Sequence, residues 1–351
     1  MIPRIALENN PTARKAYLKI RELFHSFALN RNIALVDQHI EHVCGKETLS
    51  RTSDDCIVVT VVRNGEFYIQ EFIEHYLSLG FKHIFFIDNG STDSTVSIAA
   101  QYDHVSVYRC PLPFKHYKDA MRSYLLNRFS YGRWCLLADI DEFFDYPYRE
   151  SIDLAQLINY FNQRQDSAVL LQMLDMYPDC NIQDLGNRPH QSVRDAHQFF
   201  EVATITKQAF PSRFDYKITN PNIKLHYGGV RKRLFGADPL LSKLALVKPS
   251  WPSYQVNPHW RSSAKVSDIS CVLFHYKYTD SFPDLVETAI SEKQYYRDSH
   301  EYMDYHEAMK QADRVSFCGH DSVKIKDLSQ LLSLGFIQVS AAYQEYCNLP
   351  K

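Results

Sequence analysis

The stretch CIVVTVVRNGEFYIQEFIEHYLSLGFKHIFFIDNGSTDST, residues 56–95, decides the fold. It begins with the β-branched apolar run CIVVTVV, continues with an amphipathic segment that ends in Gly80, and returns to the apolar run HIFFID. A glycine in that place is typical of a helix C-terminus, so the pattern predicts a strand, a helix and a second strand. Ser91 or Thr92 can then cap another helix.

The same alternation continues further along the chain. Residues 105–110 and 134–141 have the apolar character of strands, and residues 116–132 between them have the pattern of a helix. Repeated β-α units of roughly 25 residues are typical of a mostly parallel sheet with helices on both faces. The sequence therefore predicts an α/β fold.

Composition narrows the class of protein. The chain has 351 residues, of which 45% are hydrophobic, and a formal net charge of -2. No overall field attracts it to nucleic acid, so we expect no nucleic-acid partner. It contains no apolar run of membrane-spanning length and no signal-peptide pattern at its start. Its eight cysteines include no C-x-x-C pair. We expect a cytoplasmic protein with reduced cysteines, with a position at the inner face of a membrane left open.

The pattern divides the chain into three parts: an N-terminal helical extension at 1–53, the main domain at 54–336 and a C-terminal tail at 337–351. The extension has apolar residues at close to helical spacing, namely Tyr17, Ile20, Phe24 and Phe27. We expect this face to pack on the main domain or on a second subunit of a homodimer. A peripheral membrane contact is the alternative.

Polar side chains follow several predicted strands at the point where each strand ends. Arg63 and Asn64 follow the first strand, Asp88 follows the second, and Asp139 and Asp141 end the fourth. Ligands of such sheets bind outside the carboxyl ends of the strands. We therefore expect these residues to lie along one edge and to form a site.

The two acids of the D-x-D sequence point to a metal. On an extended backbone Asp139 and Asp141 project to the same side, where they repel one another unless a cation lies between them. Oxygen ligands suit Mg²⁺ or Mn²⁺. Alternatively, one acid caps the next segment while the other is solvated. The role of Asp88 is equally open. Its carboxylate can accept a hydrogen bond from a base or ribose, or it can merely satisfy backbone N–H groups of a turn.

These runs, together with RWCLLADIDEFF at 133–144, resemble the nucleotide-sugar glycosyltransferases of family 2, which have the GT-A fold, and especially the branch similar to family 92 proteins. The patterns of that family are N-E…E-W…Y-H…G…D-N-x-S-x-D and D-x-D-E-F. The resemblance is strong over 56–144 and extends weakly to residue 336. One departure is Gly65, which stands directly after the asparagine where the family has a glutamate, with Glu66 shifted by one.

The resemblance implies transfer of a sugar from a nucleotide-sugar donor, with a uridine nucleotide expected, to a glycan or lipid-linked acceptor. Mn²⁺ or Mg²⁺ bound by Asp139 and Asp141 would neutralise charge on the leaving diphosphate. Asp88 would hold the nucleoside, and Arg63 and Asn64 would help to position it.

Further basic residues and a histidine extend the expected site. Arg231 and Arg233 follow a Gly-Gly turn that resembles the corresponding loop of the family, so they are candidates for binding the diphosphate. His275 ends another apolar strand and is a candidate third metal ligand by resemblance; Lys277 follows it and could meet phosphate. The alternatives are a solvated basic face and a structural histidine.

The catalytic base and the acceptor side are less clearly marked. Asp175 ends the apolar run VLLQMLD and is the first candidate for the base, with Asp179 behind it and a plain loop role as the alternative. Trp251 and Trp260 are candidates for stacking on an acceptor sugar. Inversion and retention of configuration both remain open.

Two other functions fit parts of the pattern. The D-x-D at a strand end also occurs in aspartate-nucleophile phosphatases, in which the first Asp attacks phosphorus. No later Asp-Asp pair follows here to bind Mg²⁺. A sugar- or nucleotide-binding module without turnover is the other alternative, which the departure at Gly65 favours.

Overall fold

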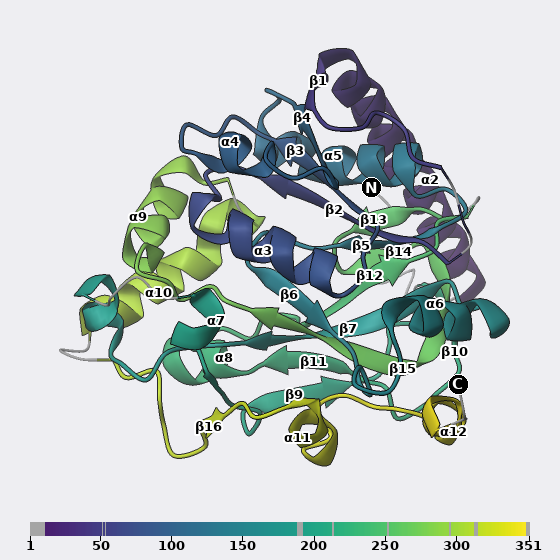
Figure 1. Ribbon diagram of the computed structural model, residues 1–351. Coiled ribbons are helices and arrows are strands. Elements are labelled where there is room, and N and C mark those ends of the chain that lie inside the picture. Colours follow the sequence, from purple (N-terminus) through teal and green to yellow (C-terminus); the bar gives the residue numbers. More distant parts are fainter. Residues whose placement is uncertain are drawn as a thin grey trace.

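The protein is built around one mixed sheet, with helices packed on it (Figure 1). The computed structural model describes residues 11–50, 52, 54–187, 192–212, 214–250, 253–294, 296–311 and 315–348, and within these ranges it leaves out the side chains of residues 11–23, 186, 187, 296, 297 and 311. The strands of the sheet, in spatial order, are β1 (Glu41–Cys44), β4 (Val105–Arg109), β3 (His83–Asp88), β2 (Cys56–Val62), β5 (Trp134–Leu137), β12 (Ser242–Val247), β7 (Ala168–Asp175), β15 (Ser263–His275) and β10 (Asp215–Ile218).

Strand direction separates the sheet into two parallel parts. Strands β4, β3, β2 and β5 are mutually parallel, and so are β7, β15 and β10. Strand β12 runs antiparallel between the two parts, and β1 is antiparallel at one edge. A further strand, β6 (Glu142–Asp145), pairs with the end of β15 in antiparallel fashion. Three small pairs lie outside the sheet: β9 (Ile205–Gln208) with β11 (Leu225–Gly228), β13 (Gln255–Asn257) with β14 (Trp260–Arg261), and β8 (Phe199–Phe200) with β16 (Val323–Lys324).

The helices follow the strands along the chain. They are α2 (Pro11–His39), α3 (Glu66–Ser78), α4 (Thr95–Ala99), α5 (Phe114–Phe129), α6 (Leu154–Gln163), α7 (Val193–Ala196), α8 (Val230–Phe235), α9 (Phe282–Glu292), α10 (His300–Gln311), α11 (Leu328–Ser333) and α12 (Ala341–Asn348), with 3-10 turns at Ile182–Asn187 and Tyr296–Ser299. Right-handed crossovers place α3 and α4 on one face and α5 on the other, because the chain steps outward from β2 to β4 and then back to β5. Helix α2 packs on α5.

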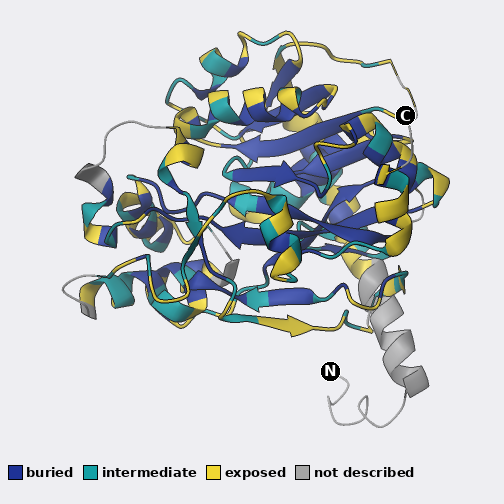
Figure 2. Ribbon diagram, turned by 60° about the horizontal axis from the view of Figure 1, so that its bottom comes forward, coloured by how far each residue is buried: buried dark blue, intermediate teal, exposed yellow. Residues whose placement is uncertain are grey.

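The apolar runs became strands because both faces of the inner sheet are covered. Every residue of β2 and β3 is buried, as expected for mainly apolar strands of a parallel sheet, and Figure 2 shows the strands of the inner sheet largely in the colour of buried residues. A second apolar cluster, around Tyr278 and Phe282, joins α8, α9 and α10. The predicted α/β class is confirmed.

Both ends of the described chain are tied to the main sheet. Strand β1 extends the sheet beyond β4, and Leu29 and Val36 of α2 are part of the main core. Phe24 and Phe27, by contrast, are exposed, so the face that packs is not the predicted one. The side chains of Tyr17 and Ile20 lie outside the described residues. At the other end the Tyr343 hydroxyl donates to the carbonyl of Pro147.

Candidate functional site

The D-x-D acids lie in a turn, which corrects the expectation of an extended backbone. Strand β5 ends at Leu137, and the N–H of Glu142 donates to the carbonyl oxygen of Asp139 at 3.0 Å. The Glu142 carboxylate in turn accepts a hydrogen bond from the N–H of Asp139 at 3.0 Å. Because the backbone reverses, Asp139 and Asp141 each reach a different set of partners.

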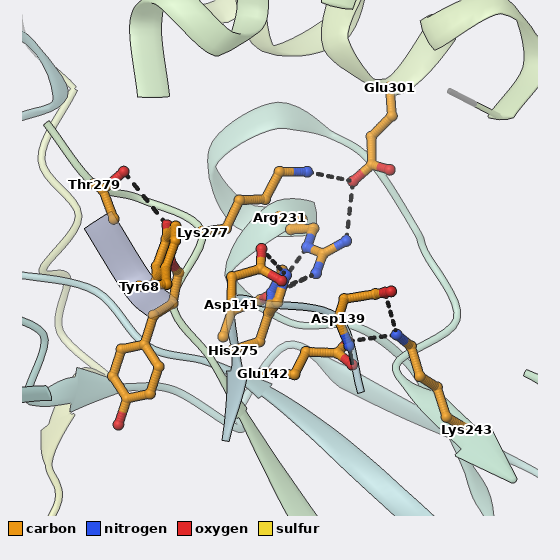
Figure 3. A network of polar contacts seen from close by, with 12 residues as sticks. Tyr68, Asp139, Asp141, Glu142, Arg231, Lys243, His275, Lys277, Thr279 and Glu301 are labelled. Carbon is orange, nitrogen blue, oxygen red and sulfur yellow. Dashed lines mark hydrogen bonds and ion pairs between the residues drawn. The ribbon is translucent and has the colours of Figure 1, made fainter. Parts of the chain in front are cut away.

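Asp139 is held by two cations of the protein, Arg122 and Lys243, and Figure 3 shows the contact with Lys243. Its carboxylate lies 2.6 Å from Nη2 of Arg122 and 2.9 Å from Nζ of Lys243. Lys243 also pairs with Glu142, and the side chains of both are almost fully buried. Burial alone would raise the pKa of Asp139, but Lys243 and Arg122 outweigh it and hold that pKa well below its ordinary value. Both oxygens of Asp139 are therefore engaged.

Asp141 belongs to a second chain of contacts, which leads into the sheet. Its Oδ2 lies 3.2 Å from Nε2 of His275, whose Nδ1 lies 2.5 Å from Oδ1 of Asp175. Arg231 then donates to both oxygens of Asp175, at 2.8 Å from Nε and 2.7 Å from Nη2. Burial would lower the pKa of His275, but the two flanking carboxylates raise it to about 9. Strand register makes this chain possible, since His275 on β15 is paired with Asp175 on β7.

This arrangement speaks against Asp175 as the catalytic base. The residue is only 4% exposed, and both of its oxygens accept hydrogen bonds from Arg231. Burial would raise its pKa, but Arg231 and His275 lower it far below its ordinary value. A carboxylate so strongly held in its charged form is a poor proton acceptor near neutral pH. Asp179, the second candidate, is exposed.

A third group of charges lies beside this chain. Glu301 of α10 lies 3.1 Å from Nη1 of Arg231 and 3.9 Å from Nζ of Lys277, as Figure 3 shows. The Lys277 ammonium also lies 4.5 Å and 4.6 Å from the ring centres of Tyr302 and Tyr305. Burial lowers the pKa of Lys277 despite the nearby Glu301. Arg231 and Lys277 thus share Glu301 as a counter-ion, and both are buried.

The residues that follow β2 and β3 hold one another in place through hydrogen bonds. Asp88 is fully buried, and its carboxylate accepts from the N–H of Ser91 at 2.9 Å and from Nε of Arg109 at 3.3 Å. Asn64 has a left-handed backbone with φ 53°, and its side-chain oxygen accepts from the N–H of Thr92 at 2.9 Å. Asp88 and Asn64 therefore shape the loop after β3.

The departure at Gly65 has a steric reason. A Cβ atom at this position would lie 2.6 Å from Cγ2 of Val62 and 3.2 Å from Cγ1 of Ile140, the middle residue of the D-x-D sequence. No side chain fits in that space. Glu66, the shifted acid, accepts a hydrogen bond from the N–H of Ser94 at 3.1 Å, so it braces the same loop.

The other predicted residues lie apart from these contacts. The half-exposed Arg63 is 3.7 Å from Glu292 of α9. Arg233 is bound to Glu201 at 2.5 Å and to the carbonyl of Phe317, away from the D-x-D acids. Trp260 is buried and stacks on Phe214, which removes it as an acceptor platform. Trp251 lies outside the described residues.

Among the described residues, the side chains that could bind a metal are a pair, Asp141 and His275, rather than a set of three. Within the described ranges, no three His, Cys, Asp or Glu side chains gather closely enough to enclose a metal ion. Oδ2 of Asp141 and Nε2 of His275, however, are 3.2 Å apart, which is the spacing of two ligands on one ion. The other ring nitrogen of His275 bonds to Asp175, as in the carboxylate–histidine–metal arrangement that orients a ligating histidine. Mg²⁺ commonly takes only one or two protein ligands, with phosphate oxygens and water completing the shell.

Three site residues were missed at the level of sequence: Arg122, Lys243 and Glu301. Lys243 carried the clearest signal, since it is a single cation within the apolar run of β12. A buried lysine requires a carboxylate partner, but the sequence does not say which one. Glu301 lies in the first turn of α10, and no feature of the sequence around it marks it as a site residue.

Comparison with known proteins identifies the domain. Residues 57–208 match the sequence profile of a family described as Glycosyl transferase family 2. No curated protein matches the chain. None of the helices in the described part of the chain combines the length and apolar character that crossing a membrane needs. The mixed sheet with its helices agrees with the predicted GT-A fold, and the two alternative functions are not retained. Residues 57–208 are a glycosyl transferase family 2 domain, and the protein is an enzyme that transfers glycosyl groups from nucleotide sugars.

Proposed function

We propose that the enzyme transfers a sugar from a uridine diphosphate donor to a hydroxyl group of a glycan or lipid-linked acceptor, with Mn²⁺ or Mg²⁺ bound at Asp141 and His275. One observation carries this proposal. Nε2 of His275 lies 3.2 Å from Oδ2 of Asp141 in the turn between β5 and β6, and Asp175 holds the other ring nitrogen. The family in general uses a divalent metal bound through its D-x-D acids.

The metal role is assigned to Asp141 and His275 rather than to all three predicted ligands. Lys243 and Arg122 already neutralise Asp139, so we assign that acid to positioning the turn. A bound divalent ion would supply positive charge where the departing diphosphate becomes more negative. Asp175 would keep Nε2 of His275 available by accepting the proton of Nδ1.

Two buried cations support the same assignment. Arg231 and Lys277 have side chains that are 6% and 8% exposed, and Arg231 is in direct contact with the Asp175 carboxylate. In a site with little water, fixed positive charges act strongly on a nearby anion. We assign to Arg231 the positioning of Asp175 and to Lys277 an attraction on the diphosphate.

The nucleoside is assigned to the loop after β3. Asp88 and Asn64 support that loop, and Arg63 lies beside it with a half-exposed guanidinium that can reach phosphate. The role of Asp88 is then to shape the loop, because it has no exposed surface for direct contact.

The test is a transfer and hydrolysis assay with a panel of uridine and guanosine diphosphate sugars, with and without Mn²⁺. Asp141→Asn should abolish Mn²⁺-dependent release of nucleoside diphosphate and the Mn²⁺-induced rise in melting temperature. Asp103→Asn, at an exposed loop position, is the matched control and should behave like the parent enzyme. Full turnover by Asp141→Asn, or equal activity in excess chelator, contradicts the metal assignment.

A further inference from the structure

A cavity of about 760 Å³ lies apart from the D-x-D acids. Its walls are formed by residues of β6, of β15 and the stretch after it, of α7, and of the segment from β16 to α11. The labels of these elements lie in the lower half of Figure 1. Pockets that bind small organic ligands commonly have volumes of about 300–1,000 Å³. The cavity is therefore large enough for an oligosaccharide of a few units.

The cavity and the proposed transfer site lie on opposite faces of the β6–β15 ladder. Register pairs His275 with Glu142, and Glu142 reaches Lys243 on the side of the D-x-D acids. The next pair, Phe274 with Phe143, points to the other face, because successive side chains of a strand alternate. Phe143 and Phe274 line the cavity. A ligand in the cavity is thus separated from Asp141 by the sheet itself.

The floor of the cavity is apolar. Phe143, Phe274 and Tyr276 line it, and Phe274 is the most exposed of the three. Arg194 spans part of this floor, with its guanidinium carbon 5.7 Å from the centre of the Phe143 ring. Phe143 and Tyr276 are 0% and 4% exposed, so Phe274 is the one of the three whose ring is accessible to the C–H face of a sugar.

The polar lining supplies donors and acceptors in balance. Arg149 and Arg194 are both paired with acids, at 3.1 Å from Asp145 and 2.7 Å from Glu71. Two lysines, two further acids and a glutamine complete the charged and amide lining, namely Lys324, Lys326, Glu150, Asp327 and Gln198. Such a lining carries little net charge, so it does not select an anion. It does suit hydroxyl groups, each of which both donates and accepts.

We propose that this cavity is a second saccharide-binding site, which holds a neutral oligosaccharide on the face of the β6–β15 ladder opposite to Asp141. The site has an apolar floor for ring faces and paired charges for hydroxyl groups. The proposal does not depend on the donor or metal assigned above, since the cavity shares neither Asp141 nor His275.

The experiment is titration calorimetry of the full chain with four uncharged trisaccharides: maltotriose, cellotriose, mannotriose and triacetylchitotriose. At least one should bind with a Kd of about 1 mM or tighter. Gln198→Ala and Lys326→Ala, both on the lining, should each weaken that binding by roughly three- to tenfold, the loss expected for one hydrogen bond. Lys217→Ala removes an exposed lysine elsewhere and should leave the Kd unchanged.

Asp141→Asn separates this site from the transfer site. It should leave the affinity for the trisaccharide unchanged, whatever happens to turnover. Three results would overturn the proposal: no binding by any of the four sugars at about 10 mM, binding that Asp141→Asn abolishes, or binding that the two lining variants do not alter. Binding of inorganic phosphate in place of the neutral sugars would also overturn it, because it would show an anion site.

Discussion

Replacing Lys243 with methionine should destabilise the protein strongly, because it removes a buried cation that has two carboxylate partners. Lys243 is 4% exposed and is in contact with both Asp139 and Glu142. Methionine fills a similar volume but leaves Glu142, whose side chain is 1% exposed, without its cation. Removing one partner of a buried ion pair costs about 3–5 kcal/mol, because the other charge stays buried and uncompensated.

The loss should appear as a lower melting temperature. An unfolding entropy of about 2.1 cal/mol/K per residue gives roughly 0.7 kcal/mol/K for the 351-residue chain, so a loss of about 3 kcal/mol corresponds to roughly 4 °C. Glu142→Gln in the Lys243→Met background should restore much of this, because it removes the uncompensated charge, while Arg122 still neutralises Asp139. Differential scanning calorimetry on the four members of this double-mutant cycle measures the coupling.

Lys248→Met is the matched control. Lys248 stands just after β12 and donates to the neutral side-chain oxygen of Asn162 at 2.8 Å, so its loss should cost about 0.5–1.5 kcal/mol. If Lys243→Met and Lys248→Met lower the melting temperature equally, or if Glu142→Gln gives no recovery, the buried ion-pair argument is wrong.

Three further predictions follow from the same contacts. Asp175→Asn removes the partner that orients His275 and should weaken Mn²⁺ affinity by roughly 10- to 100-fold, measured by calorimetry; unchanged affinity would exclude the orienting role. Gly65→Ala should cost about 1–3 kcal/mol in thermal unfolding because its Cβ meets Val62 at 2.6 Å, and a neutral effect would contradict the steric explanation. Burial raises the pKa of Glu301, but Lys277 and Arg231 outweigh it and lower the pKa from 4.5 to about 2. The carboxylate therefore contributes stability above pH 4.5 that is lost as the pH falls toward 2, and the stability difference between the parent and Glu301→Gln should shrink over that window in chemical unfolding.

Much of the architecture is predictable from local pattern. The predicted strands at 83–88 and 105–110 correspond to β3 and β4 to within a residue, since an apolar run bounded by polar turns has few other stable positions. The helix expected to be capped by Ser91 or Thr92 begins only at Thr95, because Asp88 and Asn64 hold the preceding loop in a non-helical form. The strand expected to run to residue 141 ended at Leu137.

The site was predictable only in part. Asp139, Asp141 and His275 were marked by their places at the ends of apolar runs, and the structure brings the last two together. Nothing in the neighbourhood of Asp175 could show that Arg231 would neutralise it, since the two are 56 positions apart in the chain. For this reason we propose a positioning role for Asp175 in place of the expected role as base.

Local sequence pattern is enough to predict an α/β sheet with acids at the ends of its strands, because apolar periodicity and strand termini are local properties. Which charges pair with one another depends on how the strands are arranged in space. The antiparallel insertion of β12 brings Lys243 to Asp139, and the register of β15 on β7 brings His275 to Asp175. Strand order and register depend on packing across the whole sheet, so no short stretch of sequence contains them.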